Sequence, residues 1–214
     1  MSSPPSESHA DRRLELAAAV LLTLAAVATA WSSYQSASWH GKQAEAQSAS
    51  IAARVESTRA ENVASRQAQI DVALFTQWVD AYARGETELA SFYEERFRDE
   101  FKPAFDAWVA TKPRTNPKAP LSPFAMPQYK LAATAEADRL EAEAAAQSQL
   151  VKVDIQRADN YLLAVVLFAV SLFFAGISTR LHIRSARMIV LVTGWTIFLG
   201  TLVWIATFPV NVSA

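Results

Sequence analysis

The sequence contains no cysteine and only five glycines among its 214 residues. Without cysteine there are no disulfides, no thiolate metal sites and no cysteine nucleophile. The formal net charge is −1, so the chain lacks the basic excess that favours nucleic acid as a partner. With so few glycines, and with abundant alanine, glutamate, glutamine, arginine and leucine, the composition predicts an almost entirely helical chain.

Motifs of the common enzyme classes are also missing. The chain has no H-E-x-x-H motif, no glycine-rich phosphate loop and no nucleophile elbow. Its three histidines, His9, His40 and His182, lie in three different regions and do not predict one metal site. Carboxylates crowd residues 94–100, but interleaved basic residues favour a solvated, salt-bridged face over acid–base catalysis. We therefore predict that the protein is no enzyme and binds no cofactor or metal.

Charge is absent from two long stretches near the C-terminus. No charged residue occurs from Tyr161 to Thr179 or from Met188 to Val210, and each stretch reaches the roughly 18 apolar residues that a membrane-spanning helix needs. A third, alanine-rich and largely apolar stretch lies near the N-terminus. The sequence thus predicts transmembrane helices at residues 14–31, 161–179 and 188–210.

The first apolar stretch allows two interpretations. It ends in Ala28–Ala30, an A-x-A pattern typical of secretory cleavage. The helical composition nevertheless continues beyond it, and Trp31, Tyr34 and Trp39 are residues that favour the membrane interface. We interpret the stretch as an uncleaved anchor, with cleavage before Trp31 as the alternative. For the residues that follow the apolar stretch, the functional alternative to a membrane interface is a ligand cage formed by Trp31, Tyr34, Trp39 and His40, which we favour less.

Five arginines predict the topology. They are Arg12, Arg13, Arg180, Arg184 and Arg187. Those in the acid-free loop 180–187, and those before the first span, indicate the cytoplasmic side under the positive-inside rule. Residues 1–13 then form a disordered cytoplasmic tail, and residues 32–160 lie outside. The predicted location is the inner (plasma) membrane of a bacterium, with a periplasmic or extracellular ectodomain.

The ectodomain, residues 32–160, reads as a long helical hairpin with coiled-coil character. Residues 42–84 contain neither proline nor glycine and predict a helix that Gly85 ends. A second helix is expected over residues 86–110, where Pro103 should kink it or start a new helix. Five prolines make residues 111–127 an extended loop, and helical composition resumes at Gln128.

Helical spacing predicts which apolar side chains share a face. One apolar face is expected along residues 51–74, formed by Ile51, Val55, Val63, Ile70 and Leu74. The aromatic residues on either side of Gly85 predict a hairpin core, with a ligand-binding stripe as the alternative. The predicted core residues are Phe75, Trp78, Tyr82, Phe97, Phe101, Phe105 and Trp108. Because two alanine-rich helices bury little surface, we expect a homo-oligomer.

The "WSSYQSA" stretch, the coiled middle and the paired C-terminal spans around an arginine loop resemble a family of uncharacterised bacterial inner-membrane proteins. The resemblance implies the layout and no activity. We predict a non-catalytic integral membrane protein whose helical module serves scaffolding, sensing or protein interaction. Its expected partners are the lipid bilayer, further copies of itself and an unidentified membrane or periplasmic protein. The alternative is an oligomeric channel.

Overall fold

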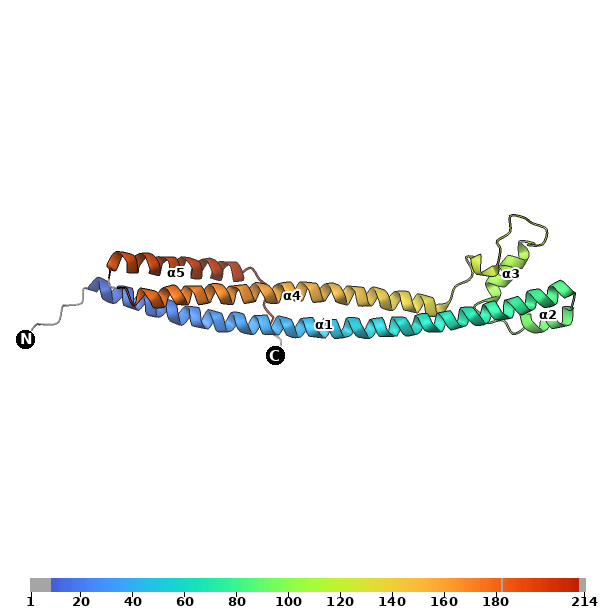
Figure 1. The fold of residues 1–214 in the computed structure, drawn as a ribbon, viewed down its shortest axis with the longest axis horizontal. Helices are drawn as coiled ribbons and strands as arrows, with labels where there is room; N and C mark the ends of the chain where they lie inside the picture. The colour runs from blue at the N-terminus through green and yellow to red at the C-terminus, as the bar shows by residue number, and fades with distance from the viewer. Residues whose placement is uncertain (1–8, 182, 212–214) are drawn as a thin grey trace, which may run out of the picture. The chain divides into compact units, whose positions relative to one another are not determined.

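The computed structural model describes residues 9–181 and 183–211, and these divide into two compact units. Unit 1 contains the residues up to Ser48 and those from Gln147 onward, whereas unit 2 is Ala49–Ala146. The helices (Figure 1) are α1 (His9–Arg84), α2 (Thr87–Glu94), α3 (Lys102–Ala110), the short 3-10 helix η1 (Pro123–Ala125), α4 (Ala132–Ser178) and α5 (Arg184–Ile205). The described residues contain no strand, so the predicted all-α class is confirmed.

Unit 1 holds three helical stretches that are long and apolar enough to cross a membrane. They belong to α1, α4 and α5, which confirms the prediction of three candidate spans. Gly194 of α5 allows these helices to pack closely, because a Cβ at this position would lie 3.2 Å from both Leu21 Cδ2 of α1 and Phe174 Cβ of α4. The buried core of these helices comprises Ala18, Leu21, Ala25, Ala164, Phe168, Ala175, Leu191, Phe198 and Ile205.

Serine hydroxyls on α1 donate hydrogen bonds to backbone carbonyls of alanines on α4. In unit 2, Ser57 follows Ser50 by seven residues on α1, whereas their acceptors Ala137 and Ala144 occur in the reverse order, also seven residues apart, on α4. The two helices are therefore antiparallel. Alanine leaves the carbonyl open to a neighbouring helix, and serine is short enough to reach it. The bonds, each 3.0 Å long, are Ser36 Oγ to Ala158 O in unit 1, and Ser50 Oγ to Ala144 O and Ser57 Oγ to Ala137 O in unit 2.

The predicted apolar face of residues 51–74 lies on the outside of the helix pair for most of its length. Ile51 and Ile70 are 58% and 51% exposed, and Val55 and Val63 are exposed as well. Only Leu74 is half-buried. The face that α1 buries in unit 2 carries small and polar side chains, because helices approach closely enough for serine–carbonyl bonds only where bulky side chains are absent. This face consists of Ser50, Ala53, Ser57, Ala64 and Asp71.

The segment after Gly85 is more broken than the sequence predicts. Gly85 ends α1 with a φ of 78°, as expected for a glycine stop. The helix predicted over residues 86–110 is interrupted between Glu94 and Lys102. Pro103 lies in the first turn of α3, where its missing N–H costs nothing, whereas inside a continuous helix it would remove a hydrogen bond.

Close approach of α1 and α4 predicts a strong effect of side-chain size. Ser57 is 2% exposed, so Ser57→Leu should force the helices apart and lower the free energy of unfolding of unit 2 by about 1–3 kcal/mol. Ser65→Leu, on an exposed position of the same helix, should change it by less than about 0.5 kcal/mol. Pulse proteolysis of the full chain in detergent measures both variants, and equal losses would contradict the packing described here.

Candidate functional site

The stretch "WSSYQSASWHGKQ" (residues 31–43) is an uninterrupted part of α1 in unit 1. Its aromatic residues divide between two faces. Trp31 and Tyr34 are 45% and 49% exposed, and their ring centroids are 6.0 Å apart. They therefore form the outward aromatic pair that an interfacial position requires. Ser32 and Gln35 lie on the opposite, fully buried face.

Gln35 holds the chain that follows α5. Its Nε2 donates to the Asn211 carbonyl oxygen at 3.2 Å, and the Asn211 N–H donates to Gln35 Oε1 at 2.9 Å. The Tyr161 hydroxyl donates to the Pro209 carbonyl oxygen at 3.2 Å. The segment after the third candidate span is thus fixed to both α1 and α4. Sequence reasoning missed this role, although the 3–4 spacing of Ser32, Gln35 and Trp39 was a usable signal.

Trp39 belongs to the buried face and not to the outward pair. It is 8% exposed and packs in one cluster with Ala158 and Tyr161. The Arg157 guanidinium carbon lies 4.5 Å from the ring centroid of Trp39, and Arg157 also pairs with Asp154 at 3.2 Å. The structure therefore places Trp39 between helices, beneath a cation, whereas Trp31 and Tyr34 remain on the outside.

The arginines that the sequence predicts to determine the topology include one that is nearly buried. Arg187 Nη2 lies 3.7 Å from Glu15 Oε1, and the Arg187 side chain is 12% exposed. This contact joins the beginning of α5 to the beginning of α1 within unit 1. The other predicted arginines are exposed: Arg12, Arg13, Arg180 and Arg184.

An aromatic core organises unit 2 beyond the paired helices. Six of the seven predicted aromatic residues lie in this core, with Phe101 fully buried and Phe75 half-buried, whereas Tyr82 does not belong to it and the prediction is wrong there. Tyr82 is 46% exposed and stacks on Trp78 with ring centroids 4.9 Å apart. Sequence reasoning missed the half-buried residues that the proline-rich loop and its end contribute. These are Phe124, Met126 and Tyr129.

A buried carboxylate network connects the segments around this core. Asp71 of α1 is 0% exposed, and its Oδ2 accepts hydrogen bonds from Arg98 Nη1 at 3.0 Å and from the Tyr129 hydroxyl at 3.2 Å. Arg98 also pairs with Glu100, whose Oε1 accepts the backbone N–H of Ala132 at 3.1 Å. The network therefore ties α1, the linker between α2 and α3, and the first residue of α4 together.

The electrostatics of this network depend on burial. Burial raises the pKa of the Asp71 carboxyl, and the charge of Arg98 opposes that rise. Burial and the neighbouring Asp71 raise the pKa of Tyr129 to about 12. Asp71 Oδ1 is buried without a hydrogen-bond partner. Within residues 9–181 and 183–211, no group of three histidine, aspartate or glutamate side chains is placed to hold a metal ion.

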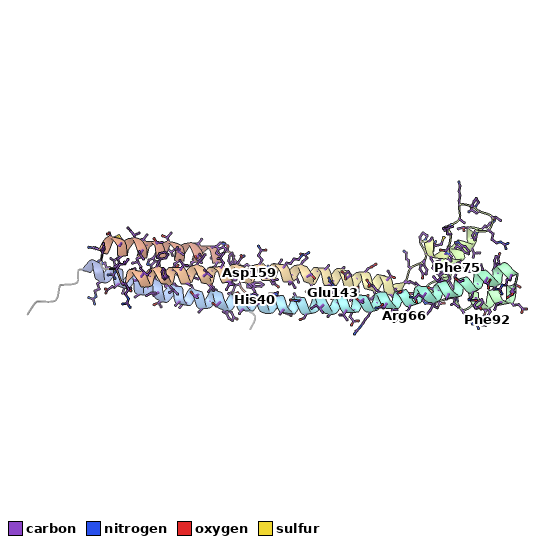
Figure 2. The ribbon with its side chains drawn as sticks, viewed as in Figure 1. His40, Arg66, Phe75, Phe92, Glu143 and Asp159 are labelled. Carbon is purple, nitrogen blue, oxygen red and sulfur yellow. The ribbon has the colours of Figure 1, made fainter. Side chains whose placement is uncertain are left out.

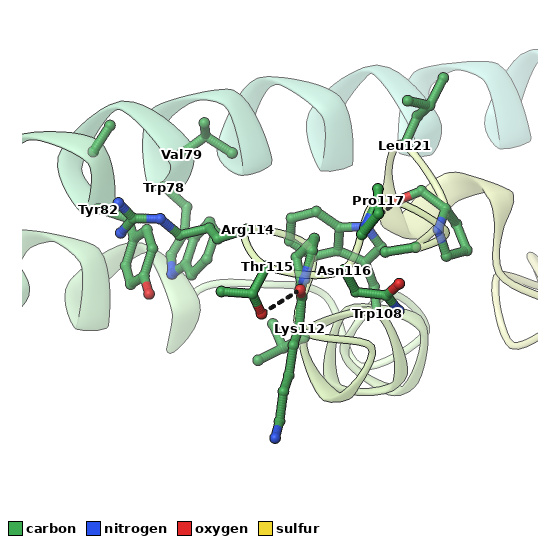
Figure 3. Close-up of a pocket in the computed structure, with 15 residues that line it drawn as sticks. Trp78, Val79, Tyr82, Trp108, Lys112, Arg114, Thr115, Asn116, Pro117 and Leu121 are labelled. Atoms are coloured by element: carbon green, nitrogen blue, oxygen red, sulfur yellow. Dashed lines mark hydrogen bonds between the residues drawn. The ribbon is translucent and has the colours of Figure 1, made fainter.

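A groove of about 1080 Å³ lies between the end of α1, the end of α3 and the proline-rich loop of unit 2. Figure 3 shows Arg114 beside the Tyr82 ring and Leu121 at the edge of the groove. Four of its lining residues are exposed apolar or aromatic side chains. They are Val79 (39%), Tyr82 (46%), Val109 (42%) and Leu121 (99%).

The groove is basic and carries no acid. Its lining includes Lys112 and Arg114 and no aspartate or glutamate. The Arg114 guanidinium carbon lies 5.6 Å from the Tyr82 ring centroid. The indole N–H of Trp108 donates to the Pro120 carbonyl oxygen at 2.8 Å and helps to hold the loop in place. The groove therefore offers a ligand ring faces, aliphatic side chains and two cations.

The central ring of the unit 2 core supplies a test. Phe101→Ala should lower the free energy of unfolding by about 3–5 kcal/mol, the usual loss for a buried ring. Phe92→Ala is the matched control on α2 (Figure 2), because Phe92 is 46% exposed and its ring contacts Arg96. We expect this control to lose less than about 1 kcal/mol. Limited proteolysis of the full chain under dilute conditions measures both, and equal digestion of wild type and Phe101→Ala would refute the core assignment.

The raised pKa of Asp71 predicts a pH dependence of stability. Above its ordinary pKa of 3.8, the folded state keeps a proton that the unfolded state releases. The free energy of unfolding therefore falls as the pH rises from 3.8 through the raised pKa of the folded state. Asp71→Asn removes the titrating group while keeping an acceptor for Arg98 and Tyr129, so this part of the pH dependence should vanish.

The effect is measured by urea unfolding of the full chain in detergent between about pH 4 and pH 7. Near-ultraviolet circular dichroism monitors the unfolding. Asp80→Asn is the control, because Asp80 lies in an exposed ion pair with Arg84. The control should keep the pH dependence of the wild type. Identical pH profiles for wild type and Asp71→Asn would show that Asp71 is not the group responsible.

Comparison with known proteins found no matching family model, no similar curated protein and no similar solved structure.

Proposed function

We propose that this protein is a non-catalytic membrane protein of the bacterial inner membrane that presents unit 2 outside as an interaction module. The observation that carries the proposal is the groove of unit 2, with its exposed apolar residues, its cations and its lack of acids. Contiguous exposed apolar surface of this kind is typical of interaction sites. Unit 1, with its three candidate spans, would supply the anchor.

The division of labour between the two units supports an interaction role. Unit 2 contains an aromatic core and a buried polar network of its own, which fix the loop that forms one wall of the groove. A rigid loop preserves a binding surface without the entropic cost of ordering it at each encounter. The network side chains of Asp71, Arg98 and Glu100 are engaged with one another and with the Ala132 backbone, which favours a structural role over catalysis.

Exposed aliphatic residues support the proposal that several copies associate along a coiled-coil-like pair of helices. Ile51, Val55 and Ile70 on α1 point away from the serine–alanine contacts with α4. Apolar side chains on the outside of a helical pair are suited to packing against further helices. An unidentified membrane or periplasmic protein is the other partner that such a surface would accept.

The proposed orientation predicts a labelling pattern. Single cysteines can be introduced without background because the chain has none. Thr115→Cys in unit 2 should react with a membrane-impermeant maleimide in cells with a permeabilised outer membrane, whereas Ser185→Cys between the last two candidate spans should react only after the inner membrane is opened. Both positions are exposed, so burial does not explain a difference. The reverse pattern would refute the proposed orientation.

The oligomeric channel remains the alternative, and conductance separates it from an interaction module. The three candidate spans pack through apolar and small residues, and an apolar constriction gates a pore by dewetting. Reproducible single-channel currents from the reconstituted full chain would favour the channel.

A further inference from the structure

Unit 2 carries two surfaces that are opposite in charge and that both expose apolar side chains. The first is the groove described above, which combines exposed apolar side chains with Arg114 and Lys112. The chain contains no acidic residue from Ala107 to Ala135, so nothing in the loop neutralises these cations. Among the described residues, neither Arg114 nor Lys112 takes part in an ion pair.

The second surface is the outer face of α2. Leu89 and Phe92 are exposed by 39% and 46% although both are apolar, and they lie three residues apart on one helical face. Glu88 and Glu95 line the same surface depression as Phe92. Glu95 is 3.9 Å from Arg96, whereas Glu88 has no ion-pair partner in the described part of the chain. This face thus offers two apolar anchors beside the carboxylates of Glu88 and Glu95, with the Arg96 guanidinium lying over one face of the Phe92 ring.

Helices with apolar anchors spaced in this way bind in apolar grooves, and aromatic anchors commonly contribute most of the binding energy. We propose that the groove of one copy binds α2 of a second copy, an inference that rests on the proposed role of unit 2 as an interaction module. Phe92 and Leu89 lie against the apolar wall of the groove, and Glu88 lies near Arg114. The occupant of the groove is therefore this chain itself.

The contact requires a second molecule because α2 is fixed within its own. Buried Ala90 of α2 belongs to the aromatic core cluster, and the turn at Gly85 holds α2 directly after α1. An interface made of two different surfaces closes as a reciprocal pair or a ring, or it extends as an open filament. Confinement to one bilayer raises the effective concentration of the partners, so a contact of modest area is sufficient.

Charge reversal tests the pairing. Full-length copies labelled at Ser65→Cys with donor or acceptor dyes are reconstituted together in phosphatidylcholine vesicles, and energy transfer is measured against surface density. Arg114→Glu in all copies should weaken association by about tenfold or more, because it brings like charges together. Glu88→Lys alone should weaken it similarly. The double variant Arg114→Glu/Glu88→Lys should restore association to within about threefold of wild type.

Arg66→Glu is the matched control. Arg66 is an exposed arginine of α1 in unit 2, labelled in Figure 2, and it does not line the groove. Its reversal should leave association unchanged, and raising the salt concentration should weaken association of the wild type. Phe92→Ala should also weaken association while leaving the fold intact.

Three outcomes would overturn the inference: no energy transfer above that expected from random proximity, equal transfer in wild type and Arg114→Glu, or no recovery in the double variant. Failure of the proposed function is recognised separately, through the maleimide pattern of Thr115→Cys and Ser185→Cys. A chain labelled in the reverse orientation would refute the proposed function while leaving the energy-transfer result to decide the self-association.

Discussion

Close antiparallel contact between α1 and α4 is the constraint on which the other features of the structure depend. Serine hydroxyls reach alanine carbonyls only where two helix backbones approach closely, and Ser50 and Ser57 do this in unit 2 while Ser36 does it in unit 1. Larger side chains are consequently excluded from the contact face. The bulky aliphatic residues of α1 are displaced to the outside, where they are available to other helices or other molecules.

The aromatic core of unit 2 begins where this contact ends. Asp71 is the last polar residue of the buried face of α1 before the tryptophan and phenylalanine cluster, and it binds Arg98 and Tyr129 from two separate segments. Burial of the carboxylate is costly, and the two hydrogen bonds offset part of that cost. In return, the network ties Tyr129, directly after the proline-rich loop, to α1, and the same loop forms one wall of the groove.

Much of the fold was predictable from the sequence because it depends on composition and on strong local signals. The three apolar stretches, the glycine stop at Gly85 and the proline-rich loop are such signals, and the structure shows a helix or a break at each. The buried face of α1 was not predictable from hydrophobicity, since alanine and serine are buried there while isoleucine is exposed. The Asp71 network and the Gln35–Asn211 contact join residues far apart in sequence, and no local periodicity reveals such pairings. The groove was missed for the same reason.

Buried polar residues also explain why α1 and α4 adopt a single register. A shift of α4 by one heptad in one direction would place Ser50 opposite Val151 instead of Ala144, and the valine side chain would obstruct the carbonyl. The opposite shift would place Ser57 opposite Lys130 instead of Ala137. Either shift would also move the α4 N-terminus away from Glu100, which accepts the Ala132 N–H in the observed register. A contact face made of alanine alone would tolerate these shifts at little cost, whereas each shift removes the alanine carbonyl that one of the two buried serine hydroxyls requires. The serine–carbonyl contacts thus give up part of the packing energy that larger apolar side chains would supply, and they specify one alignment of α1 and α4.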